Sequence, residues 1–211
     1  MVGPANLRKS VLECLLGLTP PDDGILQLAG QNPWTLTPTE WLRLRKHIGL
    51  ASLEFPLIAT LDVLTNLTLA INYHTNSRAT ATQHAEQLAA TFPIAVDLTQ
   101  LPEFLTPLAY RLALVARSLM LEQGILAVDG IFRDLNPAEK KQLFTWLLER
   151  VHAGNPTLLI STTDLALIAR LECSVLFVAE TTRIIFPSIQ ALTSSRLPEV
   201  VDFLDEMEAT E

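Results

Sequence analysis

Apolar residues recur at helical spacing along much of this chain and predict several amphipathic helices. In the segment that begins at Thr60, one helical face collects Leu61, Leu64, Leu67 and Ile71. The same reasoning applied to the rest of the chain gives helices over residues 9–18, 37–49, 60–71, 80–92, 108–121, 137–151 and 197–207.

The helix expected from residue 137 has the clearest start signal. Asn136 stands where an N-cap is expected, Pro137 takes the first helical position, and Glu139 completes a capping box. Leu143 and Leu147 continue an apolar stripe along this helix, so we expect it to pack on a core.

Strands are expected where apolar residues alternate or run together over a few positions. The stretch "ILQLAG" alternates and ends at Gly30, and "GILAVDG" reads as a buried strand that ends in Asp129. The predicted strands cover residues 25–30, 50–53, 124–130, 157–162, 173–180 and 183–186.

The order of these elements predicts an α/β fold. A loop and helix come first, a mostly helical segment occupies the middle, and strand–helix–strand units follow. We therefore expect a single domain over residues 1–211 with a helical subdomain inserted at residues 57–121.

Composition narrows the classes of function. Of the 211 residues, 49% are apolar and 18% are charged, which favours a folded chain with some apolar surface that meets a partner. The net charge is −8 and no block of Lys or Arg stands out, so nucleic acid is a poor candidate partner. Because we find neither a signal-peptide pattern nor an uncharged apolar run of about 18 residues, we expect a cytoplasmic protein.

The stretch "GPANLRKSV" begins and ends like a phosphate-binding loop. Gly3, Lys9 and Ser10 fit such a loop, whereas Asn6 and Arg8 stand where two further glycines are expected. Glycines let successive backbone N–H groups approach a phosphate closely and adopt positive φ. Arg adopts positive φ only at a cost, so we expect Arg8 to distort the loop.

Taken in order, four stretches resemble motifs of the ABC-transporter ATPases along almost the whole chain. "GPANLRKSVLECLLGL" is similar to their Walker A loop and helix, and "PPDDGILQLAG" to the strand and turn that follow. "LRLRKHIGLASLEFPLIATLDVLTNLTL" resembles the glutamine-loop region. "LTPLAYRLALVARSLMLEQGILAVDGIFRDLNP" has the spacing of the signature motif, Walker B strand and D-loop. The resemblance implies a P-loop NTPase core with an inserted helical subdomain.

Two features at the ends of the chain qualify this resemblance. The final stretch "LPEVVDFLDEM" is similar to the tail of the ATPase subunits of Mla-type (MCE-associated) lipid transporters. Met1 lies two residues before Gly3, so the N-terminal strands that the family carries ahead of its Walker A loop are expected to be missing.

The resemblance implies weak ATP and Mg²⁺ binding at most. Gly3 and Lys9 match phosphate-binding positions, Ser10 matches the Mg²⁺ hydroxyl, and Asp129 matches the Walker B aspartate.

The residues that hydrolyse ATP in this family have no counterparts here. Gly130 replaces the catalytic glutamate, Leu53 the glutamine and Thr163 the switch histidine. In the signature motif, Thr106 can supply a hydroxyl, but Pro107 lacks an N–H. We expect negligible ATP hydrolysis.

These observations predict a degenerate ABC-type subunit with a structural or regulatory role, peripheral to the inner (plasma) membrane. The implied partners are a membrane permease and a second ATPase subunit, in a homodimer or heterodimer. Phe55 and Ile58, in the apolar glutamine-loop region, are the candidate contacts with the permease. Two alternatives remain: a slow but active ABC ATPase, and a soluble adaptor that retains only the fold.

Overall fold

The computed structural model describes residues 1–75, 77–121 and 123–208, which separate into two compact units. Unit 1 comprises Met1–Pro38 and Ser161–Glu211, and unit 2 comprises Thr39–Ile160. In unit 1 the elements are α1 (Ala5–Leu15), the short helix η1 (Pro33–Thr35), α7 (Leu165–Ile168), β4 (Val175–Val178), β5 (Arg183–Phe186), α8 (Ile189–Thr193) and α9 (Pro198–Glu208). In unit 2 they are α2 (Pro38–Arg45), β1 (Ile48–Ser52), α3 (Val63–Thr75), α4 (Arg78–Ala89), η2 (Pro102–Phe104), α5 (Pro107–Leu119), β2 (Ile125–Asp129), α6 (Pro137–Gly154) and β3 (Thr157–Ser161). The first residue of α2 and the last residue of β3 fall in unit 1.

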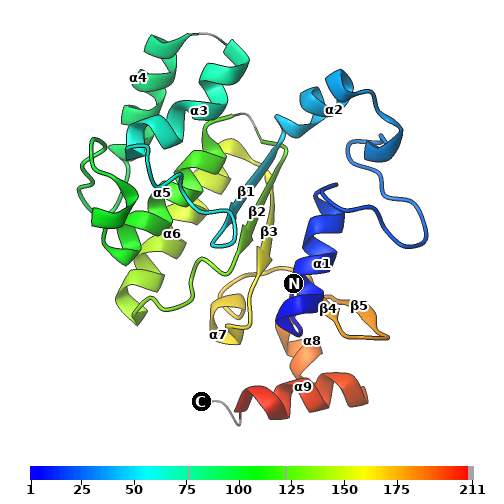
Figure 1. The fold of residues 1–211 in the computed structure, drawn as a ribbon. Coiled ribbons are helices and arrows are strands. Elements are labelled where there is room, and N and C mark those ends of the chain that lie inside the picture. Colours follow the sequence, from blue (N-terminus) through cyan, green and yellow to red (C-terminus); the bar gives the residue numbers. More distant parts are fainter. Residues whose placement is uncertain (76, 122, 209–211) are drawn as a thin grey trace. The chain divides into compact units, whose positions relative to one another are not determined.

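A three-stranded sheet of order β1–β2–β3 forms the centre of unit 2. Strands β1 and β2 are parallel and in register from Ile48 opposite Ile125 to Ser52 opposite Asp129. Helix α5 packs on β1 and β2, and α3 and α4 lie side by side next to α5 (Figure 1). The middle of β2 is fully buried, as expected of a strand that is covered on both faces.

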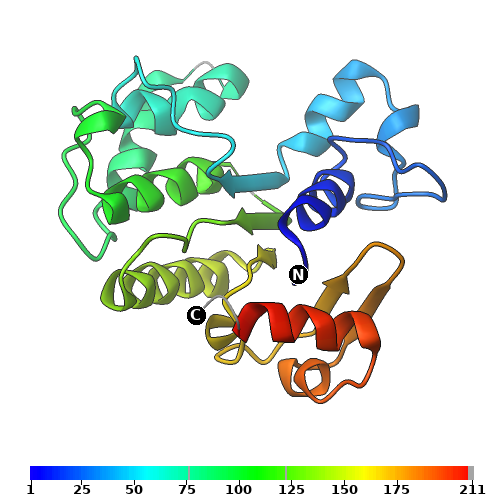
Figure 2. The same ribbon diagram turned by 60° about the horizontal axis from the view of Figure 1, so that its bottom comes forward.

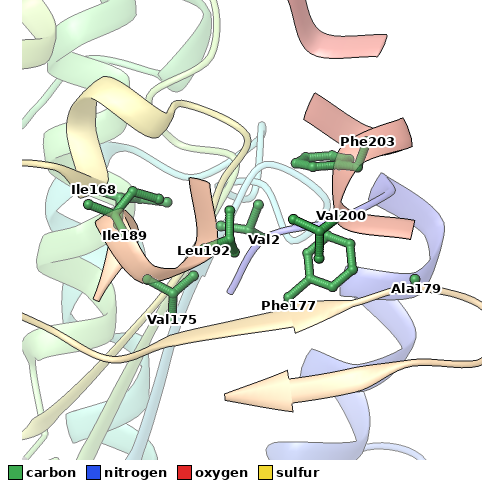
Figure 3. Packing of buried hydrophobic residues seen from close by; sticks show 9 residues of the cluster. All are labelled: Val2, Ile168, Val175, Phe177, Ala179, Ile189, Leu192, Val200 and Phe203. Atoms are coloured by element: carbon green, nitrogen blue, oxygen red, sulfur yellow. The ribbon is translucent and has the colours of Figure 1, made fainter. Parts of the chain in front are cut away.

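Unit 1 has its own core on one face of the antiparallel pair β4–β5. Phe177 of β4 is fully buried and meets Phe203 of α9 edge to face, with ring centroids 5.7 Å apart. Val2 and Leu192 complete the centre of this cluster, as Figure 3 shows. Helix α9 also packs against α8 in both ribbon views (Figures 1 and 2). The tail helix is therefore a packing element of unit 1.

Most predicted elements are present, and the capping box of α6 is confirmed. The Asn136 side chain accepts from the amide of Glu139 at 3.0 Å, and the Glu139 carboxylate accepts from the amide of Asn136 at 3.0 Å. The left-handed residue Asn155 caps the other end of this helix.

The strand predicted at residues 25–30 is wrong. Leu28 and Gln31 form only an isolated bridge, and their amides and carbonyls bond to each other across two residues. Those two residues, Ala29 and Gly30, both have positive φ, so the backbone turns back at once instead of extending.

Candidate nucleotide site

The stretch that resembles a phosphate loop folds as the start of helix α1. The helix begins at Ala5, about one turn before the predicted start at Lys9. The amide of Arg8 donates to the carbonyl of Pro4 at 3.0 Å, so this N–H bonds inside the helix. In a phosphate loop, successive N–H groups point at an anion instead. The geometry here does not fit a phosphate cradle of that kind.

Arg8 does not adopt the positive φ on which the expected distortion of the loop depended, because the residue is helical. Neither Asn6 nor Arg8 is among the residues with positive φ. The guanidinium turns into unit 1 and leaves only 8% of the residue exposed. Its Nε donates to the Gly3 carbonyl at 2.8 Å and its Nη1 to the Ser161 hydroxyl oxygen at 2.8 Å.

Gly3 has a packing reason to be glycine. Its φ is +136°, and a Cβ on it would lie 2.0 Å from the carbonyl oxygen of Val178 in β4. Any side chain at this position would therefore push the segment away from the strand. The glycine that matches the Walker A motif is explained by this close contact without a nucleotide.

The two other phosphate-loop residues lie on the exposed side of α1. Lys9 and Ser10 are both exposed. The Ser10 hydroxyl donates to the carbonyl of Asn6 at 3.1 Å, one turn earlier in the same helix. This is a common use of a helical serine.

Asp129, the candidate Walker B aspartate, lies at the end of a strand of the sheet. Asp129 ends β2 directly opposite Ser52, which ends β1, and the Ser52 hydroxyl donates to the Asp129 carboxylate at 3.3 Å. The carboxyl ends of parallel strands are the usual ligand edge of an α/β sheet. The carboxylate chemistry of Asp129 fits Mg²⁺, which prefers oxygen ligands. Leu53, next after Ser52, brings no polar side chain to this edge.

Gly130 is in the left-handed region, with φ at +65°. A Cβ on it would lie 3.3 Å from Nη2 of Arg133. A glutamate at this position would therefore carry a backbone cost of about 1–2 kcal/mol before it could act as a base.

We expect Gly130→Glu to leave ATP hydrolysis at the wild-type level. The added carboxylate meets an unfavourable backbone, and positions 53 and 163 still carry Leu and Thr. Phosphate release under excess MgATP measures the effect, with Gly130→Ala as the control that adds the Cβ without the carboxylate. Robust turnover from the glutamate variant alone would show that the rest of the site is competent.

The switch-histidine position lies in a turn whose polar groups bond locally. The amide of Asp164, next to Thr163, donates to the hydroxyl oxygen of Thr162 at 3.0 Å. The Asp164 carboxylate accepts from the amide of Leu167 at 2.9 Å and caps α7. Asp164, the acidic residue next to Thr163, therefore uses one carboxylate oxygen to cap α7.

The signature-motif position is built as the start of α5. Thr106 is the N-cap, and its hydroxyl oxygen accepts from the amide of Ala109 at 3.3 Å. Pro107 takes the first turn, where its missing N–H costs nothing to the helix. The Thr106 hydroxyl oxygen therefore caps its own helix.

Side chains of α5 bond the backbone of residues 55–57, in the segment that carries the candidate partner residues. Arg117 of α5 donates from its two Nη atoms to the carbonyls of Phe55 and Pro56, and the Tyr110 hydroxyl accepts from the amide of Leu57 at 3.1 Å. Burial lowers the pKa of the Arg117 guanidinium from its ordinary value.

A buried asparagine of α3 holds the rest of this segment. Asn66 has no exposed surface, and its Oδ1 accepts from the amide of Ile58 at 2.7 Å. Its Nδ2 donates to the carbonyls of Ile58, Leu61 and Asp62. With its backbone bonded in this way, the segment leaves 45% of Phe55 and 42% of Ile58 exposed.

Sequence reasoning missed Ser161, Asn66 and Tyr110 as positioning residues. The only signal for Asn66 was a polar residue inside an otherwise apolar helical pattern. Ser161 could not be paired with Arg8, because 153 positions separate them.

Over the described part of the chain, no group of three or more His, Cys, Asp or Glu is arranged to hold a metal ion. Within the same residues, no helix is both long and apolar enough to cross a membrane.

No family model matches this chain. It is 28% identical over 161 residues to the thiamine import ATP-binding protein ThiQ of Salmonella paratyphi A, over 76% of this chain and 66% of that protein. It is 27% identical over 165 residues to the lipoprotein-releasing system ATP-binding protein LolD 1 of Rhodopirellula baltica, over 77% of this chain and 72% of that protein. The chain thus spans just under two thirds of the length of the thiamine import protein.

Solved structures share the fold. A dimeric post-hydrolysis ATP-binding cassette bound to ADP and Pi matches with a TM-score of 0.71 and 19% identity, over 83% of this chain and 78% of that one. The cbiO1 protein of Clostridium perfringens, part of the ABC transporter complex cbiONQ, matches with a TM-score of 0.78 and 14% identity, over 97% and 85%. The predicted α/β class, with the ABC-type P-loop NTPase core, is confirmed. The curated relatives reported above are named as ATP-binding proteins of transport systems, so the chain is similar to such proteins in sequence as well as in fold.

Proposed function

We propose that this chain is a degenerate ATP-binding-type subunit of an ABC transporter, with a structural or regulatory role instead of a hydrolytic one. The observation that carries the proposal is the helical start of α1, which stands where an ABC cassette needs a phosphate loop. Gly130, Leu53 and Thr163 support it, because none of the three can replace the reactive group expected at its position.

Nucleotide binding in this proposal is weak or lost. By resemblance alone, Asp129 matches the family's Mg²⁺-binding aspartate, and Lys9 and Ser10 match residues of its phosphate loop. The amide of Arg8, however, already bonds the carbonyl of Pro4, which removes one donor that a phosphate would need. Mg²⁺, when bound, would neutralise charge on the phosphates.

The proposed partner is a membrane permease that contacts Phe55 and Ile58. Two exposed apolar side chains on a segment held by Asn66 and Arg117 form a surface whose shape is fixed before binding. Residues 57–121, which include α3, α4 and α5, would act as the helical subdomain of the cassette. A second ABC ATPase subunit, in a homodimer or heterodimer, would complete the assembly at the membrane.

A more specific form of this proposal assigns a lipid cargo to the transporter. It depends on the tail "LPEVVDFLDEM", which forms α9. Val200 and Phe203 of α9 are buried in the core of unit 1, so packing alone accounts for the apolar pattern of the tail. The curated relatives are named for thiamine import and lipoprotein release, which do not select a cargo for this chain.

Purification from membranes tests the proposal. We expect the tagged wild-type chain, expressed in its native host and extracted in mild detergent, to bring down a permease with several membrane-spanning helices. The tag alone is the control, and mass spectrometry identifies the partner. Recovery of the chain with soluble proteins only would favour the adaptor alternative, and ATP turnover by the recovered complex that Lys9→Ala abolishes would favour the active alternative.

A further inference from the structure

We infer that the buried Arg8 guanidinium holds the chain at the start of α1 in place by hydrogen bonds. A bound phosphate has this ordering role in an ordinary phosphate loop. The guanidinium is almost fully buried in unit 1. It donates one hydrogen bond to the Gly3 carbonyl and another to the Ser161 hydroxyl oxygen, each at 2.8 Å. The two acceptors come from the two separate stretches of sequence that form unit 1.

The polarity of this arrangement is the reverse of that in an anion site. A phosphate loop directs N–H donors toward a negative ligand. Here a carbonyl and a hydroxyl oxygen accept from a positive side chain. Bonds from a guanidinium are charge-assisted, and its planar fork suits two acceptors at once. A phosphate at the position of the guanidinium would meet the Gly3 carbonyl oxygen, so the loop excludes the ligand of its relatives.

The segments that Arg8 joins are the central ones of unit 1. The amide of Val2 donates to the Leu176 carbonyl at 2.9 Å, and the amide of Val178 donates to the Val2 carbonyl at 2.9 Å. On the other side, the amide of Thr162 donates to the Met1 carbonyl at 3.2 Å. Arg8 adds the link from α1 to both Gly3 and Ser161. Residues 1–8 are therefore ordered by contacts within unit 1, without a nucleotide. This inference does not depend on which partner the protein binds.

Thermal unfolding of the purified full chain tests the inference. We expect Arg8→Ala to lower the melting temperature by about 5 °C or more, because two buried charge-assisted bonds are lost. Arg170→Ala, which removes an exposed arginine of the same unit, should change it by less than about 1 °C. Ser161→Ala should cost less than Arg8→Ala, and the double variant should cost less than the two single losses together. Equal melting temperatures for wild type and Arg8→Ala, or strictly additive losses, would overturn the inference.

A second experiment, with added ligands, tests whether this region is instead an anion-binding site that Arg8 occupies. We expect neither inorganic phosphate nor ATP to raise the melting temperature of wild type or of Arg8→Gly above a NaCl control of equal ionic strength. A phosphate-dependent rise for either protein would overturn the reversed polarity. If the alanine and glycine variants do not fold, Arg8→Lys provides the test, because it keeps the charge but loses the planar fork. It should fold and have a melting temperature below that of wild type. Wild-type stability in Arg8→Lys would count against the inference. All these measurements use the isolated chain, so they can fail while a permease is still recovered.

Discussion

The purified protein is expected to hydrolyse ATP no faster than its Lys9→Ala variant. Each catalytic group that is missing commonly accounts for about 10²–10⁴ in rate. Gly130 offers no base, Leu53 no water-orienting amide and Thr163 no imidazole. Such groups act as a unit, so one surviving group adds little without the others. The Arg8 amide, which bonds Pro4, adds a fourth obstacle at the binding step.

Phosphate release by wild type and Lys9→Ala, each alone and each within the complex recovered from membranes, measures this expectation. The comparison within the complex matters because an active partner subunit could hydrolyse ATP on its own. Such activity would persist in Lys9→Ala. Turnover at about 10 s⁻¹, a typical enzyme rate, that disappears on Lys9→Ala would show that this chain is an ATPase.

The sequence was sufficient where a local pattern has only one low-energy structure. The capping box at Asn136 and Glu139 predicts the start of α6 because both partners lie within one turn. The apolar run of β2 predicts a buried strand that ends at Asp129, and the parallel pairing then places Ser52 opposite that carboxylate.

Sequence reasoning failed where a single pattern or a motif resemblance was given more weight than the backbone conformation that the local residues adopt. The alternation of apolar and polar residues at 25–30 suggested a strand. Ala29, however, adopts the left-handed conformation, which is uncommon for a residue other than glycine. At α1, the resemblance to a phosphate loop suggested an open loop up to Lys9. The stretch from Pro4 reads equally well as a helix start, and the chain takes that form.

The candidate site was predictable in its positions but not in its contacts. Spacing identified Asp129 and Gly130, and their place at the end of β2 follows from it. The bonds that give Arg8 and Asn66 their roles join residues whose proximity depends on tertiary packing. For Arg8 the partner Ser161 lies 153 positions further along the chain. Local periodicity carries no information on such pairs.

Replacing both Phe55 and Ile58 with Asp is expected to abolish recovery of the permease. Both side chains are close to half exposed, and their segment is held by Asn66, Tyr110 and Arg117 through backbone atoms. The substitutions therefore leave the supporting hydrogen bonds in place and change only the outward surface. Truncating a central anchor costs about 2–4 kcal/mol of binding. A buried charge costs more, so affinity should fall by at least about 100-fold.

The matched control is Leu69→Asp, which adds a charge at a leucine of α3 in the same unit that is 47% exposed. The control should recover the permease as wild type does, because Leu69 belongs to α3 and not to the segment that carries Phe55 and Ile58. Circular dichroism and melting temperature confirm that all variants fold. Undiminished recovery of the permease by the folded double variant would remove Phe55 and Ile58 from the interface. Equal loss in Leu69→Asp would show that added charge, and not the site of substitution, weakens the complex. Loss confined to the double variant would instead mean that a surface already fixed by buried Asn66 is the part of this fold that meets the membrane partner.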